Sequence, residues 1–109
     1  MHGFVRAVGA EHPQVVDSVS LHRWSVDEPG EFWQQVWQHG DVIGDPGAVA
    51  FDWGDGSVRG GRFFPNSSVS FAENLLVDRP GVGEEAIVAI TESGDHRSYT
   101  WRQLRAEVA

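Results

Sequence analysis

Apolar side chains recur at helical spacing through the first quarter of the chain. His12-Pro13 is predicted to end a first short helix, because proline disfavours helix at the residue before it. The apolar side of that helix carries Phe4, Val5 and Val8. Residues 15–24 are predicted to form a second short helix or turn. The residues expected to point inward from it are Val15, Val16, Val19 and Leu21.

A clearer helix is predicted from Glu31 to Gln38, and its apolar side is largely aromatic. Residues four positions apart pair on this side: Phe32 with Val36, and Trp33 with Trp37. Such a stripe can grip a planar ligand, but it more often forms core, and we favour core here.

The ends of this helix also carry signals. Ser25 and Glu28 have the spacing of a capping box, and Pro29 suits a first helical turn. Gly40 is expected to adopt the left-handed conformation that often ends a helix.

Alternation replaces helical spacing at residues 49–53, which are predicted to form a strand. Asp55-Gly56 is a typical hairpin turn, so the chain is expected to return antiparallel through Val58 toward Arg62-Phe63-Phe64. Helical spacing then resumes. Ser70 and Glu73 form a capping box ahead of a helix whose apolar side carries Phe71, Leu75 and Leu76, and which Pro80-Gly81 stops.

The last part of the sequence predicts a hairpin followed by a helix. Residues 86–91 are a compact apolar run typical of a buried strand. Ser93-Gly94-Asp95 turns the chain, and residues 97–100 pair back as an edge strand. Thr100 caps a helix whose inward residues are Trp101, Leu104 and Val108. This helix has no stop signal and the hairpin has no further strands, so we expect the sequence to be truncated.

Composition narrows the possible functions. The 109 residues carry a formal charge of −8, which makes nucleic acid and anionic membranes poor partners. All eight basic residues are Arg, which excludes a Walker-type phosphate loop, a Schiff-base lysine and a lysine general base within these residues. There is no Cys, no clear signal peptide and no apolar run long enough for a bilayer, so we expect a cytoplasmic protein.

Three segments invite a binding interpretation that their patterns do not support. Asp52 and Asp55 suggest a calcium loop, but the third acidic position and the distal Glu are missing. Residues 54–61 are Gly-rich like a phosphate cradle, yet they lack the Gly-Lys-Ser/Thr ending. Asn66-Ser67-Ser68 fits a glycosylation sequon, which means little without a secretory signal.

We find no catalytic constellation and assign no catalytic, cofactor-binding or metal-binding residue. Ser20 with His22, and Ser98 with His96, are neighbours in sequence without an oxyanion-hole motif. Glu84-Glu85 is interpreted as a solvated pair in a polar linker. His22, beside Trp24, is interpreted as a surface or packing residue. The five His show no metal-ligand spacing.

Four segments together resemble acetoacetyl-CoA synthetases, which are acyl-adenylate-forming ligases. The first three are Leu21–Val26 (LHRWSV), Glu31–Trp37 (EFWQQVW) and Arg62–Leu76 (RFFPNSSVSFAENLL). The fourth, Ala86–Ala109 (AIVAITESGDHRSYTWRQLRAEVA), looks like the first strand, hairpin and helix of the large adenylation domain. The sequence departs from the family pattern at Phe63, where Trp is usual, and at Ser70, where Asn is usual.

The resemblance implies an α+β fragment. Residues 1–80 would be a mostly helical N-terminal cap region, and residues 81–109 the truncated start of an α/β AMP-binding domain. It implies that the full-length enzyme joins acetoacetate to ATP and then to CoA, with Mg²⁺, and that this fragment is inactive alone. Its partners would be the remainder of the adenylation domain and an acyl substrate. Arg62, Glu73 and Asn74 are interpreted as fold-stabilising.

Two alternatives stay open at this point. One is an acetyl- or propionyl-CoA synthetase fragment, against which the "FAENLL" form argues. The other is a free-standing acidic protein-interaction module, which an exposed aromatic patch would mark.

Overall fold

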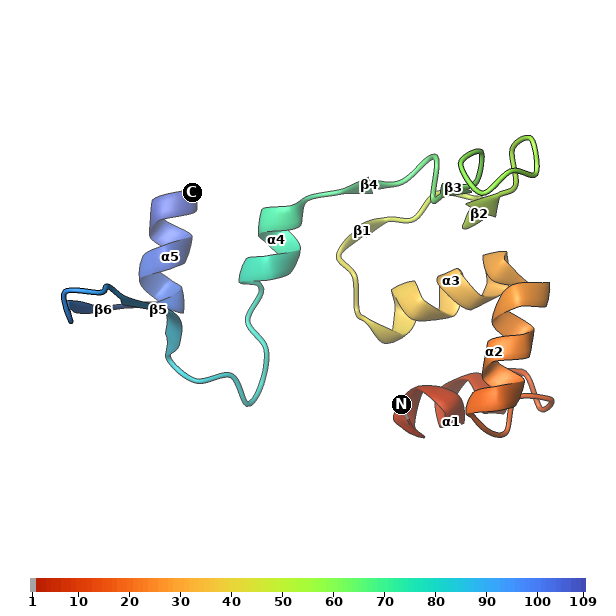
Figure 1. Ribbon diagram of the computed structural model, residues 1–109, viewed down its shortest axis with the longest axis horizontal. Coiled ribbons are helices and arrows are strands. Elements are labelled where there is room, and N and C mark those ends of the chain that lie inside the picture. Colours follow the sequence, from red (N-terminus) through yellow and green to blue (C-terminus); the bar gives the residue numbers. More distant parts are fainter. Residues whose placement is uncertain (1) are drawn as a thin grey trace. The chain divides into compact units, whose positions relative to one another are not determined.

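The computed structural model describes residues 2–109, and the chain divides into two compact units, Met1–Val69 and Ser70–Ala109 (Figure 1). The first unit contains α1 (His2–Glu11), α2 (Ser18–Asp27), α3 (Pro29–His39), β1 (Gly44–Asp45), β2 (Phe51–Asp52), β3 (Arg62–Phe63) and β4 (Ser68–Val69). The second contains α4 (Phe71–Leu76), β5 (Glu85–Ile90), β6 (His96–Thr100) and α5 (Trp101–Val108). The predicted mixture of helices and antiparallel strands is confirmed at this level.

The core of the first unit is small and lies among its three helices. Its buried residues are Val8, Val15, Leu21 and Trp24, against which Phe4, Val5 and Phe32 pack. Phe32 and Trp24 meet in a T-shaped arrangement with ring centroids 6.1 Å apart, and the His12 ring centroid lies 4.6 Å from that of the same indole. The first helix and the inward positions of Val8, Val15 and Leu21 are therefore confirmed.

Two of the predicted inward residues are wrong: Val16 is 73% exposed and Val19 is 67% exposed. The reason is where α2 begins. Val15 and Val16 precede the helix, so their directions do not follow its period. At about 100° per residue, Val19 lies roughly 160° around the helix from Leu21, on the opposite face.

A cap at Asp17 explains why α2 begins at Ser18, whereas α3 begins at Pro29 without a side-chain cap hydrogen bond. Asp17 accepts the Ser20 backbone N–H at 2.8 Å, and the Ser20 hydroxyl in turn accepts the Asp17 N–H at 3.0 Å, which makes a reciprocal capping box. The predicted box at Ser25 and Glu28 is wrong. Ser25 lies inside α2, where its hydroxyl donates to the His22 carbonyl at 2.7 Å.

The end of α3 also differs from the prediction. Gly40 stays right-handed, with φ −80°, and Asp41 adopts the left-handed conformation instead, with φ +50°. Asp41 is a short polar residue that tolerates this region better than most, so the chain reverses one residue later than expected. Pro29 at the start of α3 is confirmed.

The predicted antiparallel return is confirmed, although the strands are shorter than expected. Phe51 pairs with Phe63 and Asp52 with Arg62. Phe63 also meets Trp33 at 5.2 Å between ring centroids. Trp37 similarly meets Phe64 at 4.8 Å. The aromatic stripe of α3 thus packs against other aromatics. A second small ladder, β1 with β4, was not predicted.

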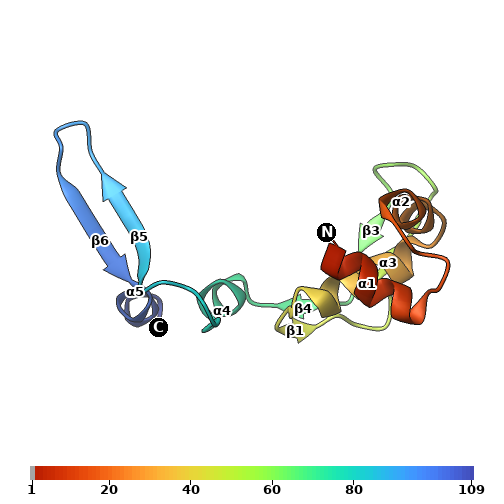
Figure 2. The same cartoon turned by 90° about the horizontal axis from the view of Figure 1, so that it is seen from below.

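In the second unit, β5 and β6 form a two-stranded antiparallel hairpin (Figure 2). Residues 91–95 join them. Gly94 N–H donates to the Thr91 carbonyl, Thr91 N–H donates to the Asp95 carbonyl, and Gly94 has φ +85°. This is a type I turn closed by a glycine bulge. The hairpin is confirmed, but β5 is not buried: Ile90 is 70% exposed, because no third strand joins this sheet within residues 2–109.

In this unit the predicted starts of the helices are confirmed, but their predicted apolar faces are only partly buried. Ser70 accepts the Glu73 N–H, which confirms the start of α4, but the helix ends at Leu76, short of Pro80. Thr100 caps α5 in a reciprocal pair with Gln103. The apolar faces are incompletely covered: Phe71 is 79% and Val108 53% exposed. Within residues 2–109, no helix has the length and apolar character to cross a bilayer.

Candidate functional site

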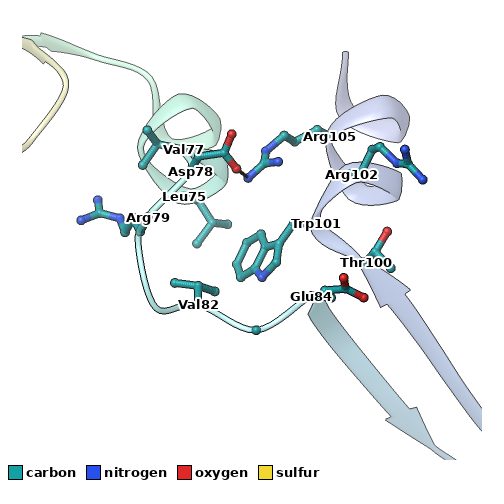
Figure 3. A pocket seen from close by; sticks show the side chains of 11 residues that line it. Leu75, Val77, Asp78, Arg79, Val82, Glu84, Thr100, Trp101, Arg102 and Arg105 are labelled. Carbon is teal, nitrogen blue, oxygen red and sulfur yellow. Dashed lines mark ion pairs between the residues drawn. The ribbon is translucent and has the colours of Figure 1, made fainter.

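A pocket of about 460 Å³ in the second unit is the strongest candidate for a site (Figure 3). It lies where the end of α4, the linker that follows and the first turns of α5 converge. Its lining comprises Leu75, Val77, Asp78, Arg79, Val82, Gly83, Glu84, Thr100, Trp101, Arg102 and Arg105.

Trp101 supplies the apolar surface of the pocket. The N-cap at Thr100 sets it in the first turn of α5, and its backbone N–H donates to the Glu84 carbonyl at 3.1 Å. Figure 3 shows its indole directed between Leu75 and Val82. The indole Nε1 is enclosed by protein atoms and has no hydrogen-bond partner among residues 2–109. Trp101 therefore offers the pocket an aromatic surface.

Arg105 lines the pocket one turn after Trp101 on α5. Its Nε donates to the Leu76 carbonyl at 2.6 Å, and its guanidinium pairs with the Asp78 carboxylate. The Leu76 carbonyl is one of those left without an intrahelical partner where α4 ends. Arg105 thus caps α4 from a position 29 residues later in the chain.

The charged rim faces outward. Arg79 and Arg102 line the pocket, but their guanidinium groups point away from the indole (Figure 3). Asp78 is engaged with Arg105. The arrangement can hold an apolar or aromatic group. Among the described lining residues, no hydrogen bond joins a nucleophile to a base.

A second hollow, of about 550 Å³, lies in the first unit between α1 and the segment that leads into α2. Its lining comprises His2, Val5, Arg6, Gly9, Val15, Val16, Asp17 and Ser18. The carboxylate of Asp17 is already engaged with the Ser20 N–H and hydroxyl. We therefore assign this hollow no chemistry.

The acidic loop residues hold their own backbone. Asp52 accepts the Gly54 N–H, and Asp55 accepts both the Ser57 hydroxyl and the Ser57 N–H. These bonds, the hydroxyl first, hold the pKa of the Asp55 carboxyl below its usual value. No group of three or more His, Cys, Asp or Glu side chains within residues 2–109 is arranged to hold a metal.

The two serine–histidine pairs lie in secondary-structure elements: Ser20 takes part in the cap of α2, and Ser98 and His96 lie in β6. Ser20 donates its hydroxyl to Asp17 at 2.7 Å, and His22 is exposed. The Ser20 N–H, and then its hydroxyl, keep the pKa of the Asp17 carboxyl below its usual value. Ser98 and His96 lie along β6, in register with Val88 and Ile90. The interpretation of these residues as non-catalytic stays a prediction, as does that of the Asn66-Ser67-Ser68 sequon.

The polar residues of the Arg62–Leu76 segment are partly accounted for. Asn74 donates from its side-chain amide to the Ser70 carbonyl at 2.9 Å, and Glu73 contributes its backbone N–H to the same cap. Arg62 pairs in register with Asp52. Sequence reasoning missed Arg105. Its spacing of four residues from Trp101, on one side of α5, was the available signal.

Two similar proteins are both named as acetoacetyl-CoA synthetases. The chain is 42% identical over 93 residues to an acetoacetyl-coenzyme A synthetase of Rhizobium meliloti, covering 85% of this chain and 14% of that protein. It is 30% identical over 111 residues to an acetoacetyl-CoA synthetase of Macaca fascicularis, covering 100% of this chain and 16% of that protein. No family model and no solved structure matches.

Proposed function

We propose that this chain, which is homologous over most of its length to two proteins named acetoacetyl-CoA synthetase, is the N-terminal portion of an ATP-dependent acetoacetate–CoA ligase. The observation that carries the proposal is this similarity. It runs through 85% of the chain yet takes up only 14% of the Rhizobium protein. The predicted resemblance is thereby confirmed. Neither relative is named as an acetyl- or propionyl-CoA synthetase, the rival assignment.

In this proposal the enzyme would join acetoacetate to ATP, releasing pyrophosphate, and the CoA thiol would then displace AMP from the acyl-adenylate. Mg²⁺ would offset phosphate charge. Residues 1–80 would form the cap region and residues 81–109 the start of the AMP-binding domain. The enzyme would be cytoplasmic. The groups that hold ATP, CoA and Mg²⁺ would come from the rest of the polypeptide, because these 109 residues contain no Lys and no phosphate-loop motif.

The 109 residues would therefore contribute structure rather than chemistry. Two polar side chains of the pocket around Trp101 are already engaged within the unit, since Arg105 bonds the Leu76 carbonyl and pairs with Asp78. This is what a segment that packs against a larger domain would show, and the incompletely covered apolar residues of β5 and α5 agree with it.

The test is to read the gene past codon 109 and to express the resulting longer protein. AMP formation that requires acetoacetate, ATP and CoA supports the proposal, with acetate and propionate as matched substrates. Equal turnover of acetate would favour the rival ligase. The 109-residue chain alone, tested in parallel, is expected to form no thioester. A genuine stop codon after Ala109 would reduce the similarity to ancestry and favour the interaction module.

A further inference from the structure

The two strands of the second unit differ sharply in composition. β5 reads Glu-Ala-Ile-Val-Ala-Ile, so apolar residues occupy both of its faces. β6 reads His-Arg-Ser-Tyr-Thr and is mostly polar. Continuous apolar runs are typical of strands covered on both faces inside a larger sheet, whereas polar and charged residues are typical of strands at a sheet edge.

The apolar residues of β5 are uncovered in this chain. Ile87 is 43% exposed, Val88 48% and Ile90 70%. They belong to both faces, because side chains alternate along a strand, so covering one face would still leave apolar surface in water. The pairing partner on one side is β6, and within residues 2–109 no strand pairs with the other side of β5.

The register identifies which backbone groups lie along that unpaired side. Thr91 N–H donates to the Asp95 carbonyl, so this pair is hydrogen-bonded. Hydrogen-bonded and non-hydrogen-bonded pairs alternate along an antiparallel ladder. Ile90 with His96, and Val88 with Ser98, are therefore non-hydrogen-bonded pairs. The N–H and C=O groups of Val88 and Ile90 point away from β6, and those of Ser98 and His96 point away from β5.

We propose that the free side of β5 is the docking edge for a strand from the polypeptide that follows residue 109 in the longer protein, and that β6 forms the outer edge of the completed sheet. The inference rests on the proposed function in requiring a longer protein. The occupant is assigned to the same polypeptide because the matched relatives extend far beyond this segment, which takes up 14% and 16% of their lengths.

Two proline substitutions separate the two edges. Val88→Pro removes an N–H from the free side of β5, and Ser98→Pro removes one from the free side of β6. Neither breaks a hydrogen bond between the strands, since both belong to non-hydrogen-bonded positions. In the longer protein, Val88→Pro is expected to lower the melting temperature by more than about 4 °C, and Ser98→Pro to change it by less than about 1 °C. In the 109-residue chain the two variants should behave alike.

Hydrogen exchange on the unmutated proteins keeps the inference testable should Val88→Pro fail to fold. The amides of Val88 and Ile90 should exchange fast in the 109-residue chain and slowly in the longer protein, while those of His96 and Ser98 stay fast in both. Equal protection of the two edges, or protection of β6 alone, would overturn the inference. Protection of Val88 that rises with concentration of the 109-residue chain would assign the edge to a second copy instead.

Ligase activity of the longer protein is measured separately. An active ligase in which both proline variants behave alike refutes the docking edge and leaves the proposed function standing. A longer protein that does not use acetoacetate but is destabilised by Val88→Pro alone refutes the proposed function and supports the edge.

Discussion

The assignment of residues to the core of the first unit can be tested with two neighbouring valines, Val15 and Val16, which the sequence pattern does not distinguish. Both Val15 and Val16 were expected to point inward. The structure leaves Val15 2% exposed and Val16 73% exposed. Val15→Ala and Val16→Ala therefore remove the same atoms from adjacent positions outside any helix, so differences in helix propensity cancel between them.

The magnitude follows from burial. Replacing Val by Ala removes the equivalent of two methylene groups, and burying each one contributes about 0.8 kcal/mol to stability. The cavity left beside Val8, Leu21 and Trp24 adds to this loss, because a core of this size collapses only partly around it. Val15→Ala should therefore lower the free energy of unfolding by about 2–3 kcal/mol. Val16→Ala should change it by less than about 0.5 kcal/mol.

The assay is urea unfolding of the 109-residue chain followed by far-ultraviolet circular dichroism. With a urea dependence of about 1–2 kcal/mol per molar, the Val15→Ala midpoint should fall by at least about 1 M, or the helical signal should be lost without urea. The Val16→Ala midpoint should move by less than about 0.5 M. Equal shifts for the two variants would refute the assignment of Val15 to the core and of Val16 to the surface.

Three further predictions concern α1, the pocket and the start of α2. Gly9→Ala should destabilise α1 although alanine favours helix, because the new Cβ would lie 2.8 Å from the Val15 carbonyl oxygen. Gly3→Ala should stabilise the helix by up to about 1 kcal/mol, because no atom lies within 4 Å of its new Cβ. The melting temperatures of the two variants test this difference. Arg105→Met should cost about 1–2 kcal/mol and speed amide exchange at the end of α4, whereas the exposed Arg102→Met should do neither. The cap hydrogen bonds hold the pKa of Asp17 in the folded state below its unfolded value of about 4, so the ionised carboxylate stabilises the fold above that pH and this contribution is lost as the pH falls through the lower folded pKa. Asp17→Asn should therefore flatten the pH dependence of unfolding below about pH 4, and an unchanged profile would contradict this cap.

Local signals were sufficient at two helix starts and one turn, although they missed the cap at Asp17 and wrongly placed one at Ser25. Ser70 and Thr100 were identified as N-caps because a cap needs only a side-chain oxygen three residues before its donor. The hairpin at Ser93-Gly94-Asp95 was identified for a similar reason, since glycine adopts the positive φ that the bulge requires without steric cost. The aromatic stripe of α3 was recognised as packing surface from its spacing alone.

Features that depend on contacts distant in sequence were decided only by the tertiary structure. The bond from Arg105 to the Leu76 carbonyl spans 29 residues, and no periodic pattern encodes it. Val16 and Val19 look as apolar as Val15, yet burial depends on where α2 begins and which face meets α1 and α3. The sequence by itself therefore determined the helices, the antiparallel pairs β2–β3 and β5–β6, the caps at Ser70 and Thr100 and the resemblance, because these depend on residue type and spacing. It did not determine the cap at Asp17 or the β1–β4 pair. The tertiary structure decided which apolar residues form core and which edge of β5 stays open, because hydrophobic burial is not directional and needs a partner surface.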